Sequence, residues 1–226
     1  MKQFLNRRHI KIIAAISMLI DHLTVFLENN AIINNYNLIF ALRAVGRIAF
    51  PLYAFMFVEG LLKTRNKKKH LLMLLVISLI TEPVFDKALF GQWVYMGHQN
   101  VIFLFLIMAI GLYLIELLPK GKEFAAVFFM LPASILAIRL NIDYSAFGVF
   151  AVSLFYILRK NKLCSILSII ITFFFEANMY GLVYLSIPIL LFYNEKEPKL
   201  PTLEKKFYQY FYPLHLGALA LISCFI

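Results

Sequence analysis

The chain has 226 residues, of which 62% are hydrophobic and only 15% are charged. Soluble domains are closer to about 45–50% apolar, so this composition argues against a water-soluble globule. The formal net charge of +10 would suggest a nucleic-acid partner in a soluble protein, but the placement of the basic residues gives a different explanation.

Apolar segments follow one another along the whole chain, and about 20 apolar residues are enough to cross a bilayer as a helix. We therefore expect an all-α, polytopic transmembrane helix bundle of about nine spans that forms one domain over residues 1–226. The predicted spans are residues 10–27, 38–62, 70–90, 101–118, 124–141, 144–158, 163–177, 179–193 and 207–225.

The basic residues predict the orientation of these spans. If the N-terminus is cytoplasmic, the N-terminal segment and the loops 63–69, 119–123, 159–162 and 194–206 face the cytoplasm and hold 18 of the 22 Lys and Arg residues. Such a bias is typical of cytoplasmic loops. We therefore expect a multi-pass protein of the cell membrane with an extracytoplasmic C-terminus, surrounded by lipid, and no nucleic-acid partner.

Several ionisable residues fall inside the predicted spans, where each costs about 2.5–3.5 kcal/mol to insert. At about 1.5 Å per helical residue, they gather in the outer half of the membrane. They are Asp21, His22, Arg43, Arg47, Glu82, Arg139, Asp143 and Glu176. One interpretation is a functional polar cavity. The alternatives are buried ion pairs that hold helices together and arginines that extend to the outer headgroups.

Lys11 and His22 have a particular relation. Eleven residues are about three helical turns, so the two side chains share one stripe of the helix and lie about 16 Å apart along its axis. A cation at the cytoplasmic edge suits a phosphate, and a histidine suits proton transfer. An extended pantetheine arm has about the length of this gap. The alternatives are that Lys11 only anchors the topology and that His22 is a packing residue.

Other parts of the sequence give weaker signals. His215 follows Tyr212-Pro213-Leu214 in the last predicted span and is either a second functional histidine or a packing residue. The sequence contains no Walker or Rossmann glycine pattern, no zinc-ligand cluster and no Gly-x-Ser-x-Gly elbow, so no metal is expected.

A series of motifs follows in order along the chain. They are KIIAAISMLIDH from Lys11 to His22, GRIAFPLYAF from Gly46 to Phe55 continuing to Glu59-Gly60, Gln99-Asn100-Val101, Asp143-Tyr144 with Gly148, and Tyr212-Pro213-Leu214-His215. Together they resemble the TraX family, which is named for the F-pilin acetylase of conjugative plasmids. Ser145 departs from the family pattern, which has glycine after Asp-Tyr.

The resemblance implies a polytopic acetyltransferase that uses cytoplasmic acetyl-CoA as its acyl donor. The chain also has a weaker resemblance to the wider transmembrane acyltransferase group. In that group a basic residue and a histidine on the first helix are typically separated by ten residues, and Lys11 and His22 have this spacing here. The acceptor would be an envelope glycan, a lipid-linked sugar or a peptide amine. The rival functions are a transporter or flippase with an intramembrane charged site, and a structural or assembly protein of the membrane.

The expected mechanism assigns roles to individual residues. His22, oriented by the neighbouring Asp21, would act as general base or carry the acetyl group itself, and Arg47 would stabilise the oxyanion. The phosphates of CoA would bind the basic residues of the first helix, and further candidates lie elsewhere in the polar layer. The phosphate ligands are Lys11, Arg7 and Arg8, and the further candidates are Arg43, Glu82, Asn100, Asp143, Tyr144, Glu176 and His215.

Overall fold

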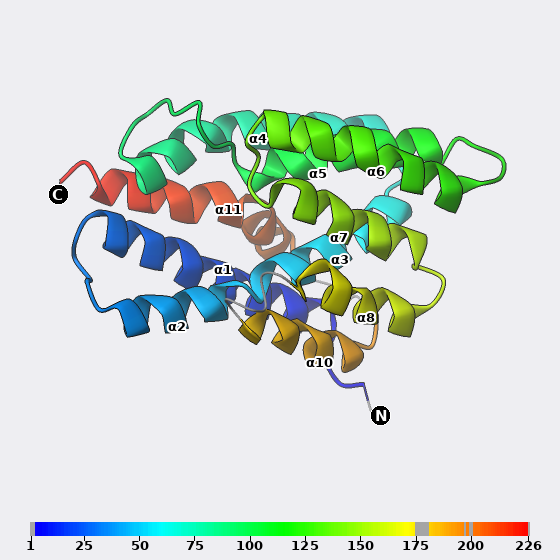
Figure 1. Cartoon of the computed structure of the whole chain (residues 1–226), viewed down its shortest axis with the longest axis horizontal. Helices are drawn as coiled ribbons and strands as arrows, with labels where there is room; N and C mark the ends of the chain where they lie inside the picture. The colour runs from blue at the N-terminus through cyan, green and yellow to red at the C-terminus, as the bar shows by residue number, and fades with distance from the viewer. Residues whose placement is uncertain (1–2, 175–180, 197, 199–200, 226) are drawn as a thin grey trace. The chain divides into compact units, whose positions relative to one another are not determined.

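The computed structural model describes residues 3–174, 181–196, 198 and 201–225 (Figure 1). In these residues the chain is all-α, and the only extended pairing is two isolated bridges. The expected fold class is confirmed to this extent. The helices are α1 (Arg7–Asn29), α2 (Tyr36–Gly46), α3 (Ala49–Lys63), α4 (Lys67–Phe90), α5 (Val101–Ile115), α6 (Lys122–Arg139), α7 (Ser145–Ile157), α8 (Lys162–Thr172), the 3₁₀ helix η1 (Gly181–Leu185), α10 (Ser186–Leu191) and α11 (Thr202–Ile222).

Each predicted span coincides with one or two of these helices. Among the described residues, two helical stretches, Arg7–Asn29 and Tyr36–Lys63, are long and apolar enough to cross a membrane. Four others, Val101–Ile115, Ser145–Ile157, Lys162–Thr172 and Gly181–Leu191, are apolar but shorter. A complete set of nine crossings stays a prediction. Glu176, one of the candidate residues, lies outside the described part of the chain.

The predicted span over 38–62 coincides with the apolar stretch Tyr36–Lys63, but its helix is interrupted between α2 and α3 at residues 47–48. Pro51 explains the interruption. In a continuous helix its nitrogen would face the Arg47 carbonyl without a hydrogen to donate, and its ring would clash with that carbonyl. In α3, Pro51 instead occupies the first turn, where no such donor is needed. The break is stabilised by Ser17 of α1, whose hydroxyl donates to the carbonyls of Val45 and Gly46 at 2.5 and 3.2 Å.

The chain divides into two compact units, which are described separately. Unit 1 consists of Met1–Tyr53, Pro83–Val94 and Phe173–Ile226, and unit 2 consists of Ala54–Glu82 and Tyr95–Thr172. Since both units are assembled from separate parts of the sequence, and α3 and α4 contribute to each, the expectation of one domain stays a prediction.

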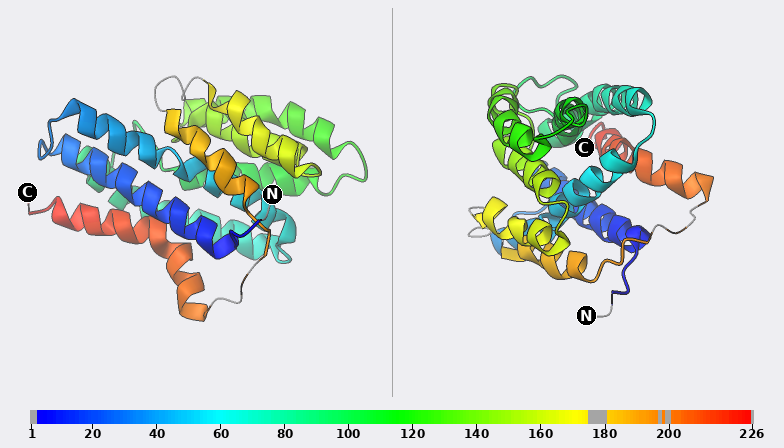
Figure 2. Two further views of the ribbon diagram at one scale, coloured as in Figure 1. Left: turned by 90° about the horizontal axis from the view of Figure 1, so that it is seen from below. Right: turned by 90° about the vertical axis from the view of Figure 1, so that its right-hand side faces the viewer.

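In unit 1 the C-terminal part of α11 runs parallel to α1 and lies beside it in Figure 1 and in the left view of Figure 2, whereas the first turns of α11 bend away. Side-chain contacts join the two helices at both ends. Near the start of both helices, Arg8 donates to Glu204 at 2.6 Å, and Lys11 lies over the ring of Tyr208. Further along, His22 meets His215. Candidate functional groups at different heights on α1 therefore have defined partners on α11.

In unit 2, α5, α6 and α7 pack against one another, and α8 packs against α7. Gly111 of α5 lets the Phe129 ring of α6 approach so closely that an added Cβ would overlap it. Near the start of α6, Glu123 forms ion pairs with Arg159 at 3.3 Å and with Lys160 at 3.0 Å. The hydrogen bond from Lys160 is the main reason why the pKa of Glu123 lies below its ordinary value.

The turn that leads into α7 explains why the family pattern has glycine at the position of Ser145. Tyr144 and Ser145 have φ angles of 60° and 41°, in the left-handed region that favours glycine. Ser145→Gly should therefore raise the stability of the protein by up to about 1 kcal/mol, because relief of about 1–2 kcal/mol of backbone strain exceeds the added entropy of the unfolded chain, about 0.4–1 kcal/mol. Thermal denaturation in detergent measures the effect. Ser145→Val should lower the melting temperature, and a lower melting temperature for Ser145→Gly as well would contradict the strained turn.

Candidate functional site

The centre of the candidate site is a pair of histidines in unit 1. Nδ1 of His22 and Nε2 of His215 are 2.7 Å apart, and the two rings are nearly parallel, with an interplanar angle of 6°. Both side chains are 7% exposed. The ring of Tyr212 meets both imidazoles edge-on, with centroids at 5.6 and 5.7 Å. His215 is therefore a direct contact of His22 within unit 1.

The hydrogen bonds of His215 define the protonation of the pair. Nδ1 of His215 lies 2.7 Å from the carbonyl oxygen of Phe211, which can only accept, so this nitrogen carries the hydrogen. In the neutral imidazole, Nε2 of His215 is then the acceptor, and Nδ1 of His22 must donate to it. Consequently Nε2 of His22 carries a lone pair and no hydrogen. This is the form that a general base or a nucleophile requires.

Asp21 does not hold the position that the sequence suggested for it. Its carboxylate forms an ion pair with Arg43 at 2.9 Å, and both side chains are largely buried. His215 thus provides the orienting hydrogen bond that we expected from Asp21, for a simple reason: adjacent residues of a helix point in directions about 100° apart. Gly46 makes the ion pair possible, because a Cβ at this position would overlap the Asp21 side chain.

The two arginines of this region lie at the C-terminal end of α2, just before and within the break between α2 and α3. Arg43 belongs to the last turn of α2, where a cation also interacts favourably with the helix dipole, and Arg47 is the C-cap residue. Arg47 thus follows Arg43 by about one helical turn, and Arg43 is itself paired with Asp21.

The basic residues of the first turns of α1 have unequal surroundings. Lys11 has its ammonium group 5.7 Å from the centre of the Tyr208 ring, and Arg8 is half exposed while paired with Glu204. Arg7 is 9% exposed, and its backbone nitrogen donates to the carbonyl of Lys196 at 3.1 Å. Lys11 and Arg8 could therefore meet a phosphate, whereas the Arg7 side chain is largely enclosed.

The remaining candidates belong to unit 2 and form their own cluster. Glu82 accepts hydrogen bonds from the backbone nitrogen and the side-chain amide of Asn100, and Asn100 in turn caps the first turn of α5. Asp143 accepts from the Tyr144 nitrogen at 3.0 Å and lies 3.6 Å from Nε2 of His98. These bonds give Glu82, Asn100 and Asp143 clear structural roles at helix ends and turns. The structure does not place them relative to the histidine pair.

Sequence reasoning missed three features of unit 1. Ser17 bonds the carbonyls at the helix break, Asp86 of α4 is a buried carboxylate engaged with a neighbouring group, and Asn29 and Asn30 line a pocket at the end of α1. A carboxylate inside a predicted span is a signal that could have identified Asp86. No comparable signal marks a serine or an asparagine.

Comparisons with known proteins give two matches. A family model described as "TraX protein" matches residues 6–223. A protein of Dichelobacter nodosus described as "Probable fimbrial assembly protein FimC, serogroup H1" is 37% identical over 78 residues, which are 34% of this chain and 30% of that relative. The chain therefore spans less than a third of the length of the curated relative that it matches. No solved structure matches the chain.

Proposed function

The chain belongs to the TraX family, and from this premise we propose that it is a membrane-embedded acyltransferase. It moves an acetyl group from cytoplasmic acetyl-CoA to an acceptor hydroxyl or amine on the extracytoplasmic side. The observation that carries the proposal is the hydrogen-bonded pair of His22 and His215, which leaves a basic nitrogen on the same helix as Lys11.

A location in the membrane is supported by the surface of the helices. On α6 of unit 2, one face presents large apolar side chains that are 51–69% exposed and recur at helical spacing over its whole length. They are Phe124, Val127, Phe128, Leu131, Ile135 and Ile138. A continuous apolar face of this kind marks contact with lipid or with a partner rather than with water. The two long apolar stretches, Arg7–Asn29 and Tyr36–Lys63, agree with lipid as the surrounding medium.

The proposed chemistry follows from the state of the pair. Nε2 of His22 takes the proton of the acceptor as the acceptor oxygen or nitrogen attacks the thioester carbonyl. The charge that develops on the carbonyl oxygen is stabilised by Arg47, with Arg43 held by Asp21 nearby. When the carbon–sulfur bond breaks, His22 gives the proton to the leaving thiolate. His215 keeps the imidazole in place throughout by accepting from Nδ1.

The donor is proposed to lie along α1. Lys11 and Arg8 hold its phosphates at the basic end, and the pantetheine arm covers the distance of about 16 Å along the helix to His22. Arg8 is half exposed and binds Glu204 through Nε, which leaves the rest of its guanidinium to meet a phosphate, and the Lys11 ammonium lies over the Tyr208 ring at the same end of α1.

A transporter or flippase is the second candidate, because an interrupted helix beside charged residues is a typical transport site. The interruption at residues 47–48, next to Arg43 and Arg47, is the observation in its favour. The fimbrial assembly protein that the chain resembles over 78 residues supports a role at the cell envelope for either candidate, or for an assembly protein.

The donor site can be tested on the purified protein in nanodiscs with radiolabelled acetyl-CoA. Lys11→Glu replaces an attraction by a repulsion and should weaken acetyl-CoA binding at least about tenfold, the loss of one charged hydrogen bond. Lys11→Arg should bind normally, since either cation meets a phosphate. Lys120→Glu, at an exposed loop, is the matched control for net charge. Calorimetry gives the affinity, and release of free thiol gives turnover.

The outcomes separate the candidates. Binding and thiol release that depend on Lys11 support the acyltransferase. Unchanged affinity in Lys11→Glu would place the donor elsewhere. No binding and no thiol release, together with solute flux in proteoliposomes, would favour the transporter. A negative result for binding, thiol release and solute flux alike would leave an assembly role.

A further inference from the structure

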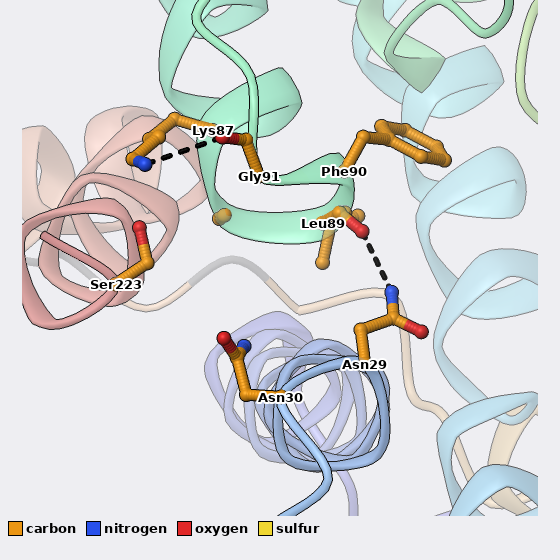
Figure 3. A pocket seen from close by; sticks show the side chains of 8 residues that line it. Asn29, Asn30, Lys87, Leu89, Phe90, Gly91 and Ser223 are labelled. Carbon is orange, nitrogen blue, oxygen red and sulfur yellow. Dashed lines mark hydrogen bonds between the residues drawn. The ribbon is translucent and has the colours of Figure 1, made fainter. Parts of the chain in front are cut away.

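Unit 1 contains a pocket of about 450 Å³ at the ends of α1 and α11 that lie farthest from Lys11 (Figure 3). Three helices end around it. Asn29 and Asn30 close α1, Gly91 follows the last residue of α4, and Ser223 is the C-cap of α11. The volume is within the range of about 300–1,000 Å³ that is usual for small-molecule sites.

The side chains around this pocket use part of their hydrogen-bonding capacity within the protein. The Asn29 amide donates to the Leu89 carbonyl at 2.7 Å, the Asn30 amide donates to the Phe26 carbonyl at 2.8 Å, and the Ser223 hydroxyl donates to the Ala220 carbonyl at 2.8 Å. The Ser223 hydroxyl therefore offers only its oxygen to a ligand, whereas each asparagine offers its oxygen and its second amide hydrogen. A ligand that satisfies them must bring both donors and acceptors, as hydroxyl groups do.

The positive charge of Lys87 determines which hydrogen-bonding groups a ligand can carry in this pocket. The C-terminal ends of helices attract positive charge, but here the chain supplies the cation itself: the Lys87 ammonium donates to the Gly91 carbonyl at 3.2 Å (Figure 3). No carboxylate is among the described residues that line the pocket. A second cation, such as the ammonium group of a peptide, would be repelled. Neutral hydroxyl groups would instead donate to the oxygens and accept from Lys87.

The pocket and the histidine pair lie on the same two helices. Seven residues separate His22 from Asn29, and eight separate His215 from Ser223, so both helices lead from the pair to the pocket over about 10–12 Å. The basic end that holds Lys11 lies in the opposite direction. A donor and an acceptor could thus approach His22 from opposite ends of the same seam.

We infer that this pocket is the acceptor subsite and that it takes a hydroxyl-bearing saccharide rather than an amine. The inference rests on the proposed function. One sugar unit would bind between Asn30, Lys87 and Ser223, and a hydroxyl farther along the saccharide would reach Nε2 of His22. That oxygen forms the ester bond to the acetyl carbon, its proton passes to His22, and CoA leaves as the thiol.

The test compares two acceptors in nanodiscs with radiolabelled acetyl-CoA. N,N′-diacetylchitobiose is the saccharide, and alanyl-alanyl-alanine amide is the amine. Radiolabel should enter the disaccharide and not the peptide. Lys87→Met and Ser223→Val should each raise KM for the disaccharide by about tenfold, because each removes one contact. Lys68→Met, which removes a positive charge from an exposed position in the first turn of α4, is the control and should change neither KM nor the thiol release measured without an acceptor.

The failures of the two proposals are distinguishable. Acetyl-CoA cleavage that requires His22, but with radiolabel only in the peptide or with KM unchanged in both pocket variants, would overturn the saccharide subsite and leave the acyltransferase intact. An absence of any cleavage that requires His22 would overturn the acyltransferase and the subsite with it. Melting temperatures close to that of the parent establish that the variants are folded.

Discussion

Replacing His22 with asparagine should lower the rate of acetyl transfer by about 10²–10⁴-fold, the usual contribution of a general base. The amide nitrogen of asparagine occupies nearly the position of Nδ1, so it can still donate to His215. The basic nitrogen on the far side of the ring is lost. The melting temperature should therefore fall little while turnover collapses. Thiol release under saturating acetyl-CoA measures the effect.

Two further variants separate the roles within the pair. His215→Gln can place an acceptor oxygen near the position of Nε2, and it should keep much more activity than His215→Ala, because His215 positions His22 and need not take up a proton. His9→Gln is the control for loss of a histidine, since glutamine preserves the capping box that His9 forms with Asn6. Full activity of His22→Asn would mean that His22 serves only packing.

Asp21→Asn is expected to have the largest effect on stability. It leaves Arg43 without its ionised partner where both side chains are largely buried, and breaking a buried pair in this way costs about 3–5 kcal/mol. The yield of folded protein and its melting temperature should fall steeply. Thermal denaturation in detergent, followed by intrinsic fluorescence, measures the change.

The double variant Asp21→Asn/Arg43→Gln provides the decisive comparison. It removes both charges, and it should recover much of the stability that Asp21→Asn loses. Arg8→Gln is the matched control, because its ion pair with Glu204 belongs to the same unit but has Arg8 half exposed, and such pairs contribute about 0–1 kcal/mol. If Asp21→Asn proves as mild as Arg8→Gln, the buried pair does not hold α1 to α2.

The helices could be predicted from the sequence because each apolar segment carries its own signal. Long runs of apolar residues, separated by short basic loops, place almost every helix within a few residues of its observed bounds. The break at residues 47–48 needed one further consideration, the missing hydrogen of Pro51. This signal was present in the sequence, but it was outweighed by the apolar character of the segment as a whole.

The partners within the site could be predicted only in part. Helical periodicity shows that Lys11 and His22 share a face, but it cannot show which helix covers that face. His215 is 193 residues away from His22, and the adjacent Asp21 looked like the nearer partner. Likewise, the ion pair between Asp21 and Arg43 depends on the close approach of α1 and α2 that Gly46 allows. This approach is a property of the packed helices, and neither sequence segment shows it alone.

The pairing of α1 with α11 also determines when the pair of His22 and His215 forms during protein synthesis. Ribosomes add about 5–20 residues per second, so about 10–40 s pass between the emergence of His22 and that of His215. Throughout this interval the His22 imidazole is in a nascent chain without the acceptor that fixes its tautomer. Under the proposed mechanism, acyl transfer would begin only after α11 has docked, and a chain released early would be inert towards the thioester.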